Sequence, residues 1–385
     1  MLNRREFLRL IVKGAVLGNF LTLVGTPLKK AVAAGEINRL PVIWLETGSC
    51  TGDSISLDNI WTPTFMDILY KILDWRYDWV VMQSSAESAF QVLLDTIENM
   101  VNQYTLVVQG AMLQRDGGNY NHIAYHEGKL ITGLELVRRV GLKARYVVAI
   151  GTCATYGGVV AAFPNPTQGT GVQNILPERR VINVSGCPAH PDWVMGTLLH
   201  LALYGEPELD SFGRPKMFYG ETVHNNCPRR RYYDQGIFAT DIGQKECLYR
   251  VGCKGPVTYA DCPIRRWNDR MNWPIGCNSP CIGCTEPGFP DKMEPFRAHF
   301  PDIPFPGGTR MATDKIGLGV LGLTGTAITA HLAASLYKGR LHHNLLKSTV
   351  KQNSRPPVKK TKSAKTYRLK KTNPATPQPN SPGSS

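Results

Sequence analysis

Cysteine supplies most of the potential chemistry of this 385-residue chain, which contains ten cysteines. Seven of them fall within 58 residues, between Cys227 and Cys284, in a segment with many prolines and glycines. Such a segment cannot bury much apolar surface, so we expect bound metal to organise it. The residues at ligand spacing form two groups, which are His224, Cys227, Cys247 and Cys253, and then Cys262, Cys277, Cys281 and Cys284.

The spacing of these groups does not by itself name the metal. Cysteine and histidine in sets of four are the usual ligands of zinc. Iron–sulfur clusters use the same thiolates, with histidine as an occasional replacement. A disulfide framework is the third option. It is disfavoured because a chain of this length has a core large enough not to need disulfides, and because His224 stands at ligand spacing.

Three more cysteines follow short hydrophobic runs in the first half of the chain. Between residues 41 and 204 strand-like runs alternate with helical patterns, which predicts a parallel sheet covered on both faces. Cys50, Cys153 and Cys187 each follow such a run and lie beside glycines. Ligands bind beyond the carboxyl ends of the strands in these sheets, so we expect the three thiols to converge. The expected strands are 41–46, 79–83, 105–110, 145–151 and 181–186, and the clearest helices are 86–101 and 127–140.

Charge is distributed very unevenly along the chain. The formal net charge is +14, but residues 338–385 contain twelve lysines and arginines and no acidic residue. The rest of the chain therefore carries only +2, so no basic surface for nucleic acid is implied for the folded body. This terminal segment is rich in Pro, Lys, Ser and Thr, a composition typical of disorder.

Two hydrophobic segments do not have the pattern of a protein core and instead resemble an export signal and a membrane-spanning helix. Residues 1–34 contain Arg4-Arg5 followed by an apolar stretch and small residues, a pattern like that of a twin-arginine export signal. An ordinary signal peptide or a retained anchor is the alternative. Residues 316–337 carry no formal charge over twenty-two positions, enough to span a bilayer as a helix. The basic tail then stays in the cytoplasm while the body is exported, as the positive-inside rule requires.

A redox role is the interpretation that best unites these features. The chain has three sets of ligands, one of them on a flavodoxin-like sheet, and a membrane anchor. Three structural zinc sites would have no evident purpose in such a protein. Three iron–sulfur clusters would instead form a route for electrons.

At the cysteines the sequence resembles the small subunits of nickel–iron hydrogenases, and the resemblance runs in order from about residue 3 to residue 340. The motifs that look like those of the proximal cluster are 44–46 with 50–52, 151–158 (GTCATYGG) and 186–191 (GCPAHP). Residues 224–230 (HNNCPRR) and 247–256 (CLYRVGCKGP) look like the distal-cluster motifs. Cys262, residues 272–274 (NWP) and 280–284 (PCIGC) resemble the medial-cluster region.

The resemblance implies a flavodoxin-like doubly wound α/β domain, a loop-rich cluster domain and a C-terminal transmembrane helix. It divides the chain into an export signal (1–34), a sheet domain with the proximal cluster (35–210), a medial and distal cluster domain (211–314), a membrane helix (315–338) and a basic cytoplasmic tail (339–385). It implies a large subunit that holds the nickel–iron centre, and a cytochrome b-type membrane partner that passes electrons to or from quinone. Proximal and distal 4Fe-4S clusters and a medial 3Fe-4S or 4Fe-4S cluster would carry electrons between them, with the body on the periplasmic side.

The chain departs from the family pattern at the proximal motif. The position three residues after Cys50 usually holds a second cysteine, and here it is Asp53. We expect Asp53 to be the fourth ligand beside Cys50, Cys153 and Cys187; the alternative is that it caps the following helix. The extra cysteines of the oxygen-tolerant six-cysteine version are also missing, with Gly52 at one position and Tyr120 near the other.

The medial motif also departs from the family pattern, but here the chain has one cysteine more than usual. Typical medial sites have three cysteines, matched here by Cys262, Cys281 and Cys284. Cys277 is an additional thiol four residues before Cys281, and we expect it to complete a 4Fe-4S cluster. The alternative is a spare thiol that packs nearby.

Two other functions remain open from the sequence. The first is the cluster-bearing subunit of respiratory complex I, which has a related sheet but lacks the motifs of residues 224–284. The second is a membrane-tethered zinc protein with a binding role. No catalytic residue is expected on this chain under the hydrogenase interpretation, because the large subunit's metal-binding motifs are absent.

Overall fold

The computed structural model describes residues 39–60, 64–297, 303–304, 310–311 and 313–338. The expected export signal and basic tail lie outside these residues. The chain up to Phe300 forms one compact unit, and the chain from Pro301 forms another.

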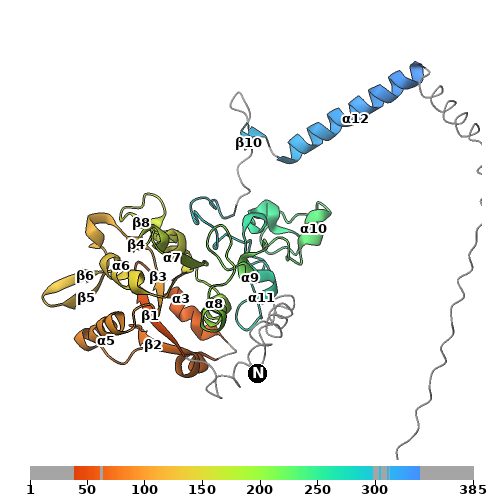
Figure 1. Ribbon diagram of the computed structural model, residues 1–385. Coiled ribbons are helices and arrows are strands. Elements are labelled where there is room, and N and C mark those ends of the chain that lie inside the picture. The colour runs from red at the N-terminus through yellow and green to blue at the C-terminus, as the bar shows by residue number, and fades with distance from the viewer. Residues whose placement is uncertain (1–38, 61–63, 298–302, 305–309, 312, 339–385) are drawn as a thin grey trace, which may run out of the picture. The chain divides into compact units, whose positions relative to one another are not determined.

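A five-stranded parallel sheet is the centre of the first unit (Figure 1). Its strand order is β2-β1-β3-β7-β9, which is the doubly wound order 2-1-3-4-5 of flavodoxin-like sheets when only these strands are numbered. The strands are β1 Leu40–Glu46, β2 Leu73–Tyr77, β3 Thr105–Gln109, β7 Tyr146–Ile150 and β9 Val181–Val184.

Alternating residues of the strands feed two separate cores, because successive side chains in a strand point to opposite faces. In β1, Val42 and Trp44 belong to one cluster, and Ile43 and Leu45 to the other. Helices α5 (Ala86–Asn99) and α6 (Gly133–Lys143) cover the second cluster. Helix α8 (Pro191–Tyr204) covers the first, which confirms the expected parallel sheet with helices on both faces.

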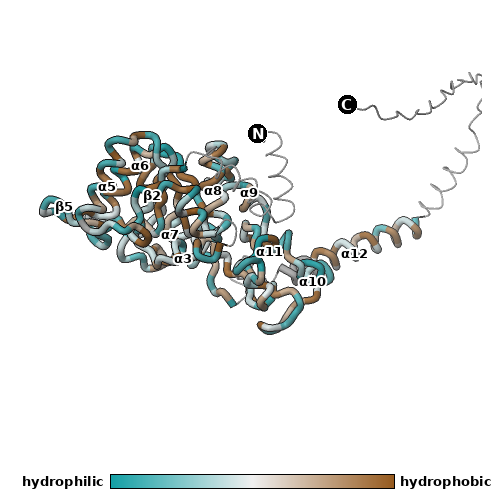
Figure 2. The backbone as a smooth tube through the Cα atoms, turned by 90° about the horizontal axis from the view of Figure 1, so that it is seen from below, coloured by the Kyte–Doolittle hydropathy of each residue, from teal (hydrophilic) through white to brown (hydrophobic). Residues whose placement is uncertain are grey.

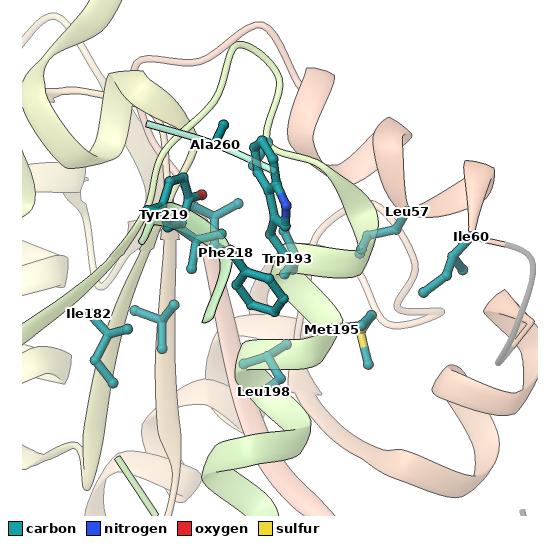
Figure 3. Packing of buried hydrophobic residues seen from close by; sticks show 14 of the residues in the cluster. Leu57, Ile60, Ile182, Trp193, Met195, Leu198, Phe218, Tyr219 and Ala260 are labelled. Carbon is teal, nitrogen blue, oxygen red and sulfur yellow. The ribbon is translucent and has the colours of Figure 1, made fainter. Parts of the chain in front are cut away.

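The core under α8 also joins the sheet to the cysteine-rich region. Trp193 of α8 lies beside Phe218 and Tyr219 in Figure 3, and its ring centroid is 5.1 Å from that of Tyr219. Val223 and Trp273 belong to the same cluster. The expected boundary near residue 210 therefore lies inside one continuously packed unit.

The remaining elements of this unit are short. Two small antiparallel pairs join β4 (Met112–Leu113) with β8 (Gly169–Thr170), and β5 (His122–His126) with β6 (Lys129–Thr132). The short helices are α3 Gly52–Ser56, α4 Phe65–Asp67, α7 Gly151–Tyr156, α9 Lys216–Tyr219, α10 Arg230–Asp234 and α11 Cys262–Arg265.

Two expected elements are wrong in detail. Residues 79–83 form no strand; the buried Asp78 accepts the backbone N–H groups of Val80 and Val81 through Oδ1, which makes a turn, and the Trp79 side chain is exposed. The edge strand is instead β2, which pairs with β1. The helix expected at 127–140 begins only at Gly133, because 122–132 fold into the β5–β6 hairpin, which is hydrophilic in Figure 2.

The second unit contains helix α12 (Thr313–Tyr337) and the short pair β10 (Ile303–Pro304) with β11 (Arg310–Met311). Within α12, Gly319–Tyr337 is long and apolar enough to cross a membrane, and none of it is buried in the described structure. Figure 2 shows hydrophobic residues along its length. This helix matches the expected span of 316–337.

Candidate functional site

The three cysteines of the first region lie at one edge of the sheet. Cys50 follows β1, Cys153 lies in α7 directly after β7, and Cys187 follows β9. Burial raises the pKa of the Cys187 thiol to about 12, and the neighbouring Cys153, Asp53 and Cys50 add to this shift. The structure thus brings together the four residues expected at the proximal site.

Asp53 is buried in this group and is tied to the loop that carries Cys187. Its Oδ1 accepts the backbone N–H of Ala189 at 2.6 Å. Burial, aided by the nearby Glu46, raises the pKa of Asp53 from 3.8 to about 7 although this hydrogen bond lowers it. Thr51, not Asp53, occupies the N-cap position of α3. The helix-cap alternative is therefore unsupported.

Glycines leave room for the carboxylate and the thiols. A Cβ on Gly151, whose φ is +81°, would lie 2.1 Å from Asp53 Oδ2. A Cβ on Gly158 would lie 2.9 Å from Cys153 Sγ. Any larger residue at either position would displace the side chains expected to face a bulky inorganic group.

Cys262, Cys281 and Cys284 form a second group in the cysteine-rich region. Burial raises the pKa of each thiol, and the charges of Cys281 and Cys284 raise that of Cys262 further. Cys277 is exposed, as Cys50 and Cys187 of the first group are. It does face the same cavity, of about 630 Å³, whose lining includes Gly52, Cys187, Cys262, Cys277, Cys281 and Cys284.

The third group contains Cys227, Cys247 and Cys253. Burial raises the pKa of all three thiols, and each is raised further by at least one other member of the group. His224 lies beside them through its backbone, since its N–H donates to Gly255 O at 3.1 Å and its carbonyl accepts from Cys227 N at 3.2 Å. Burial and Arg230 lower the pKa of its imidazole, which favours the neutral form that binds metals.

Hydrogen bonds connect neighbouring groups. The hydroxyl of Thr152, next to Cys153, donates to the backbone carbonyl of Cys284. The backbone N–H of Lys254, next to Cys253, donates to Cys281 O at 2.8 Å. The first group is therefore linked to the second, and the second to the third, by one hydrogen bond at each junction.

The donor arrangement fits clusters better than single ions. Among the described residues, no three His, Cys, Asp or Glu side chains are close enough to hold one metal ion. Zinc in a structural site draws its four ligands around a single centre. In an iron–sulfur cluster each thiolate binds a different iron atom, so the ligands need not converge on a single ion.

A buried arginine supports the loop that carries Cys262. Arg265 lies three residues after this cysteine and pairs with Asp261 at 2.6 Å and with Asp192 at 3.2 Å. Its side chain is almost fully buried. Burial of a charged residue so close to a ligand motif is not indicated by any sequence pattern, so sequence reasoning missed this support.

A second buried arginine supports the loop that carries Cys284. Arg214 pairs with Asp210 at 2.8 Å and with Glu286, two residues after Cys284, at 2.9 Å. Its side chain is also almost fully buried. In the sequence, an acidic residue two positions after Cys284 is only a weak signal that Glu286 supports this loop.

Two family models match the chain, one after the other. The model described as NADH ubiquinone oxidoreductase, 20 Kd subunit, matches residues 50–201, and a model for the C-terminal part of NiFe/NiFeSe hydrogenase small subunits matches residues 219–297. The periplasmic NiFeSe hydrogenase small subunit of Desulfomicrobium baculatum is 37% identical over 315 residues, which cover 77% of this chain and 98% of that protein. The chain belongs to the family of nickel–iron hydrogenase small subunits.

Other hydrogenase small subunits match over similar lengths. The quinone-reactive Ni/Fe-hydrogenase small chain of Wolinella succinogenes is 36% identical over 322 residues, 81% of this chain and 90% of that one. The hydrogenase-1 small chain of Escherichia coli K12 is 34% identical over 312 residues, 80% of this chain and 82% of that one.

Solved hydrogenases share the fold. A chain of the Desulfomicrobium baculatum NiFeSe hydrogenase aligns with a TM-score of 0.65 at 37% identity, covering 68% of this chain and 99% of that one. A chain of the actinobacterial-type NiFe-hydrogenase from Ralstonia eutropha H16 aligns with a TM-score of 0.65 at 28% identity, covering 86% of this chain and 95% of that one.

Family membership confirms the expected resemblance. This hydrogenase small subunit is part of an oxidoreductase whose catalytic nickel–iron centre is on the large subunit. The complex I alternative accounts only for the sheet region, because residues 219–297 match the hydrogenase-specific model.

Proposed function

We propose that this protein conducts electrons between the nickel–iron centre of a large subunit and a cytochrome b-type membrane partner that reacts with quinone, in the direction of hydrogen uptake. Relatives named quinone-reactive and uptake hydrogenases support this assignment. When bound, iron–sulfur clusters supply one-electron redox sites whose potentials depend on their ligands, hydrogen bonds and burial.

Three sets of side chains hold the clusters in this proposal. The proximal set is Cys50, Asp53, Cys153 and Cys187, the medial set is Cys262, Cys277, Cys281 and Cys284, and the distal set is His224, Cys227, Cys247 and Cys253. The observation that carries the proposal is a pair of hydrogen bonds, from Thr152 to the Cys284 carbonyl and from the Lys254 amide to the Cys281 carbonyl, which join the loops of the three sets in sequence. A chain with three unrelated structural sites would have no need of such junctions.

Asp53 is the unusual member of the proximal set. Its burial and its place among three thiols support the ligand role, and the presence of Thr51 at the N-cap of α3 speaks against the capping role. A carboxylate is a harder donor than a thiolate, so it changes the electronic properties of the site.

In this proposal helix α12 anchors the protein in the membrane, and the membrane-spanning segment is 315–338. Residues 1–34 then direct export, 35–210 hold the proximal site, 211–314 hold the medial and distal sites, and the basic residues 339–385 remain in the cytoplasm while the body faces the periplasm. The exposure of Gly319–Tyr337 in the described structure supports a lipid-facing role.

One experiment tests the function and its alternative together. The chain is expressed with a large subunit, once at full length and once with a stop codon in place of Lys315. We expect brown protein with about twelve irons per small subunit, as three four-iron clusters require. The full-length complex should stay with the membrane and the shortened one should not. Colourless protein that contains zinc would overturn the proposal in favour of a zinc-binding protein.

A further inference from the structure

Thr152 occupies the place where three loops of this protein meet. It stands between Gly151 and Cys153 in the first turn of α7, and its side chain is almost fully buried. Its hydroxyl donates to the backbone carbonyl of Cys284, 132 residues away in sequence. The same hydroxyl accepts the backbone N–H of Gly186 at 3.0 Å.

The backbone of Thr152 strengthens this meeting point. Its N–H donates to Gly186 O at 2.7 Å, so Thr152 and Gly186 exchange two hydrogen bonds. Cys153 and Cys187 are the next residues in their respective loops. Thr152 therefore fixes the two proximal loops to each other and fixes the medial Cys284 to both.

This arrangement keeps Cys284 near Cys187: both cysteines line the same cavity, and the backbone amide of Cys187 lowers the pKa of the Cys284 thiol. The carbonyl of Cys284 is held by Thr152, and the residues after it are held by Arg214, which donates to Thr285 O at 3.2 Å. With its carbonyl fixed at one point, Cys284 keeps its sulfur near the Cys187 amide. A donor to a ligating sulfur favours the reduced, more negative state of a cluster.

We propose that Thr152 is a positioning residue that couples the proximal and medial sites, through its hydroxyl bond to Cys284. The inference rests on the proposed function, because both sites must hold clusters. The Thr152 hydroxyl donates to the Cys284 carbonyl and accepts from Gly186 at once, as a hydroxyl can. Valine has nearly the same shape and does neither.

The junction between the medial and distal sites offers an internal comparison. There the N–H of Lys254 donates to Cys281 O at 2.8 Å, and the backbone amide of Cys281 lowers the pKa of the Cys253 thiol. Both interactions use only backbone groups on the donor side. A change at Thr152 should therefore leave the medial–distal junction as it is.

The test compares Thr152→Val with Thr152→Ser in the complex with the large subunit. Iron content is measured first, and EPR spectra and a redox titration then follow each site. EPR signals of neighbouring paramagnetic clusters split one another more strongly as the clusters approach. We expect iron content to be unchanged in both variants. In T152V the proximal–medial splitting weakens and the medial potential shifts downward, while T152S retains both values and the medial–distal splitting is unchanged.

A matched control is Thr155→Val, because Thr155 is also buried in α7 and donates to the carbonyl of Thr152 at 3.3 Å. T155V should leave the splitting and the potential unchanged. If T152V does not take up iron, the pair Thr152→Ser and Thr152→Ala, which differ by one hydroxyl, provides the same comparison. Equal spectra and potentials in T152V and the unmodified complex overturn the inference. Iron-free unmodified protein overturns the proposed function instead.

Discussion

The carboxylate of Asp53 accepts the backbone N–H of Ala189 at 2.6 Å, although the two residues lie 136 positions apart. This bond ties the loop after β1 to the loop after β9, which carries Cys187. The second oxygen, Oδ2, lies beside Gly151, where glycine has no Cβ that would clash with it. Under the proposed function, a carboxylate held in this manner takes the place of the missing thiol as the fourth ligand.

Removing the Asp53 carboxylate should change the proximal site alone. Asp53→Asn keeps an oxygen that accepts from Ala189 but removes the charge, and Asp53→Ala removes both. We expect the spectrum and the potential of the proximal cluster to change in each variant, by EPR and redox titration, with the medial and distal signals unchanged. Asp78→Asn is the control, because Asp78 is also buried and also accepts backbone N–H groups. An unchanged proximal cluster in Asp53→Ala would dispose of the ligand role.

Removing the Cys277 thiol should expose a three-iron medial site. Cys277 faces the cavity that Cys262, Cys281 and Cys284 also line. We expect the oxidised wild-type complex to lack a three-iron EPR signal, and Cys277→Ala to show one. Cys262→Ala serves for comparison and should lose the medial signal altogether. A three-iron signal already present in the wild type means that Cys277 is not a ligand.

Arg214 should be important for stability because it is buried between two carboxylates. Arg214→Met leaves Asp210 and Glu286 without their cation, and breaking a buried pair in this way costs about 3–5 kcal/mol. The exposed pair Arg180–Glu206 is the matched control, and Arg180→Met should cost about 1 kcal/mol or less. Thermal unfolding of the purified complexes measures both. Equal shifts in the two midpoints would show that the buried pair has no special role.

His190 should make stability depend on pH. Its Nε2–H donates to Arg266 O at 2.6 Å and its Nδ1 accepts from Asp192 N at 3.1 Å, so the bonds require a neutral ring. Burial lowers the pKa of His190 below 6.5. The folded state therefore takes up this proton less readily than the unfolded chain. Its contribution is complete above pH 6.5 and is lost as the pH falls below that value.

The measurement for His190 is the unfolding midpoint between about pH 7.5 and pH 5, a range that brackets the ordinary pKa of histidine. We expect it to fall with pH more steeply in the wild type than in His190→Asn. Asparagine keeps an acceptor at the N-cap of α8 and does not titrate. Parallel curves for the two proteins would assign the pH dependence to other groups.

The sheet could be predicted well from the sequence where strands are central and poorly at its edge. Hydrophobic runs such as 105–110 and 145–151 are buried on both faces, so their pattern is strong. The edge strand β2 is only half buried and contains Asp74 and Arg76, so its pattern does not stand out from its polar neighbours. The rule that ligands gather at the carboxyl ends of parallel strands grouped Cys50, Cys153 and Cys187 correctly.

The supports of the site could not be predicted from the sequence. Thr152, Arg214 and Arg265 act through partners that are distant in the chain, such as Cys284, Glu286 and Asp192. Such contacts follow from the packing of the cysteine-rich loops on the sheet, and no local pattern encodes them. The exposed position of Cys277 was equally invisible in its spacing.

Reduction by hydrogen is the most direct test of whether the three sites conduct electrons from the large subunit. The small subunit is prepared with its clusters, alone and in complex with the large subunit, and both are exposed to hydrogen while EPR follows the proximal, medial and distal signals. We expect all three sites to become reduced in the complex and none of them in the small subunit alone. Hydrogen-driven reduction of the isolated chain, or a complex in which hydrogen reduces the proximal site but never the other two, would contradict the proposed function.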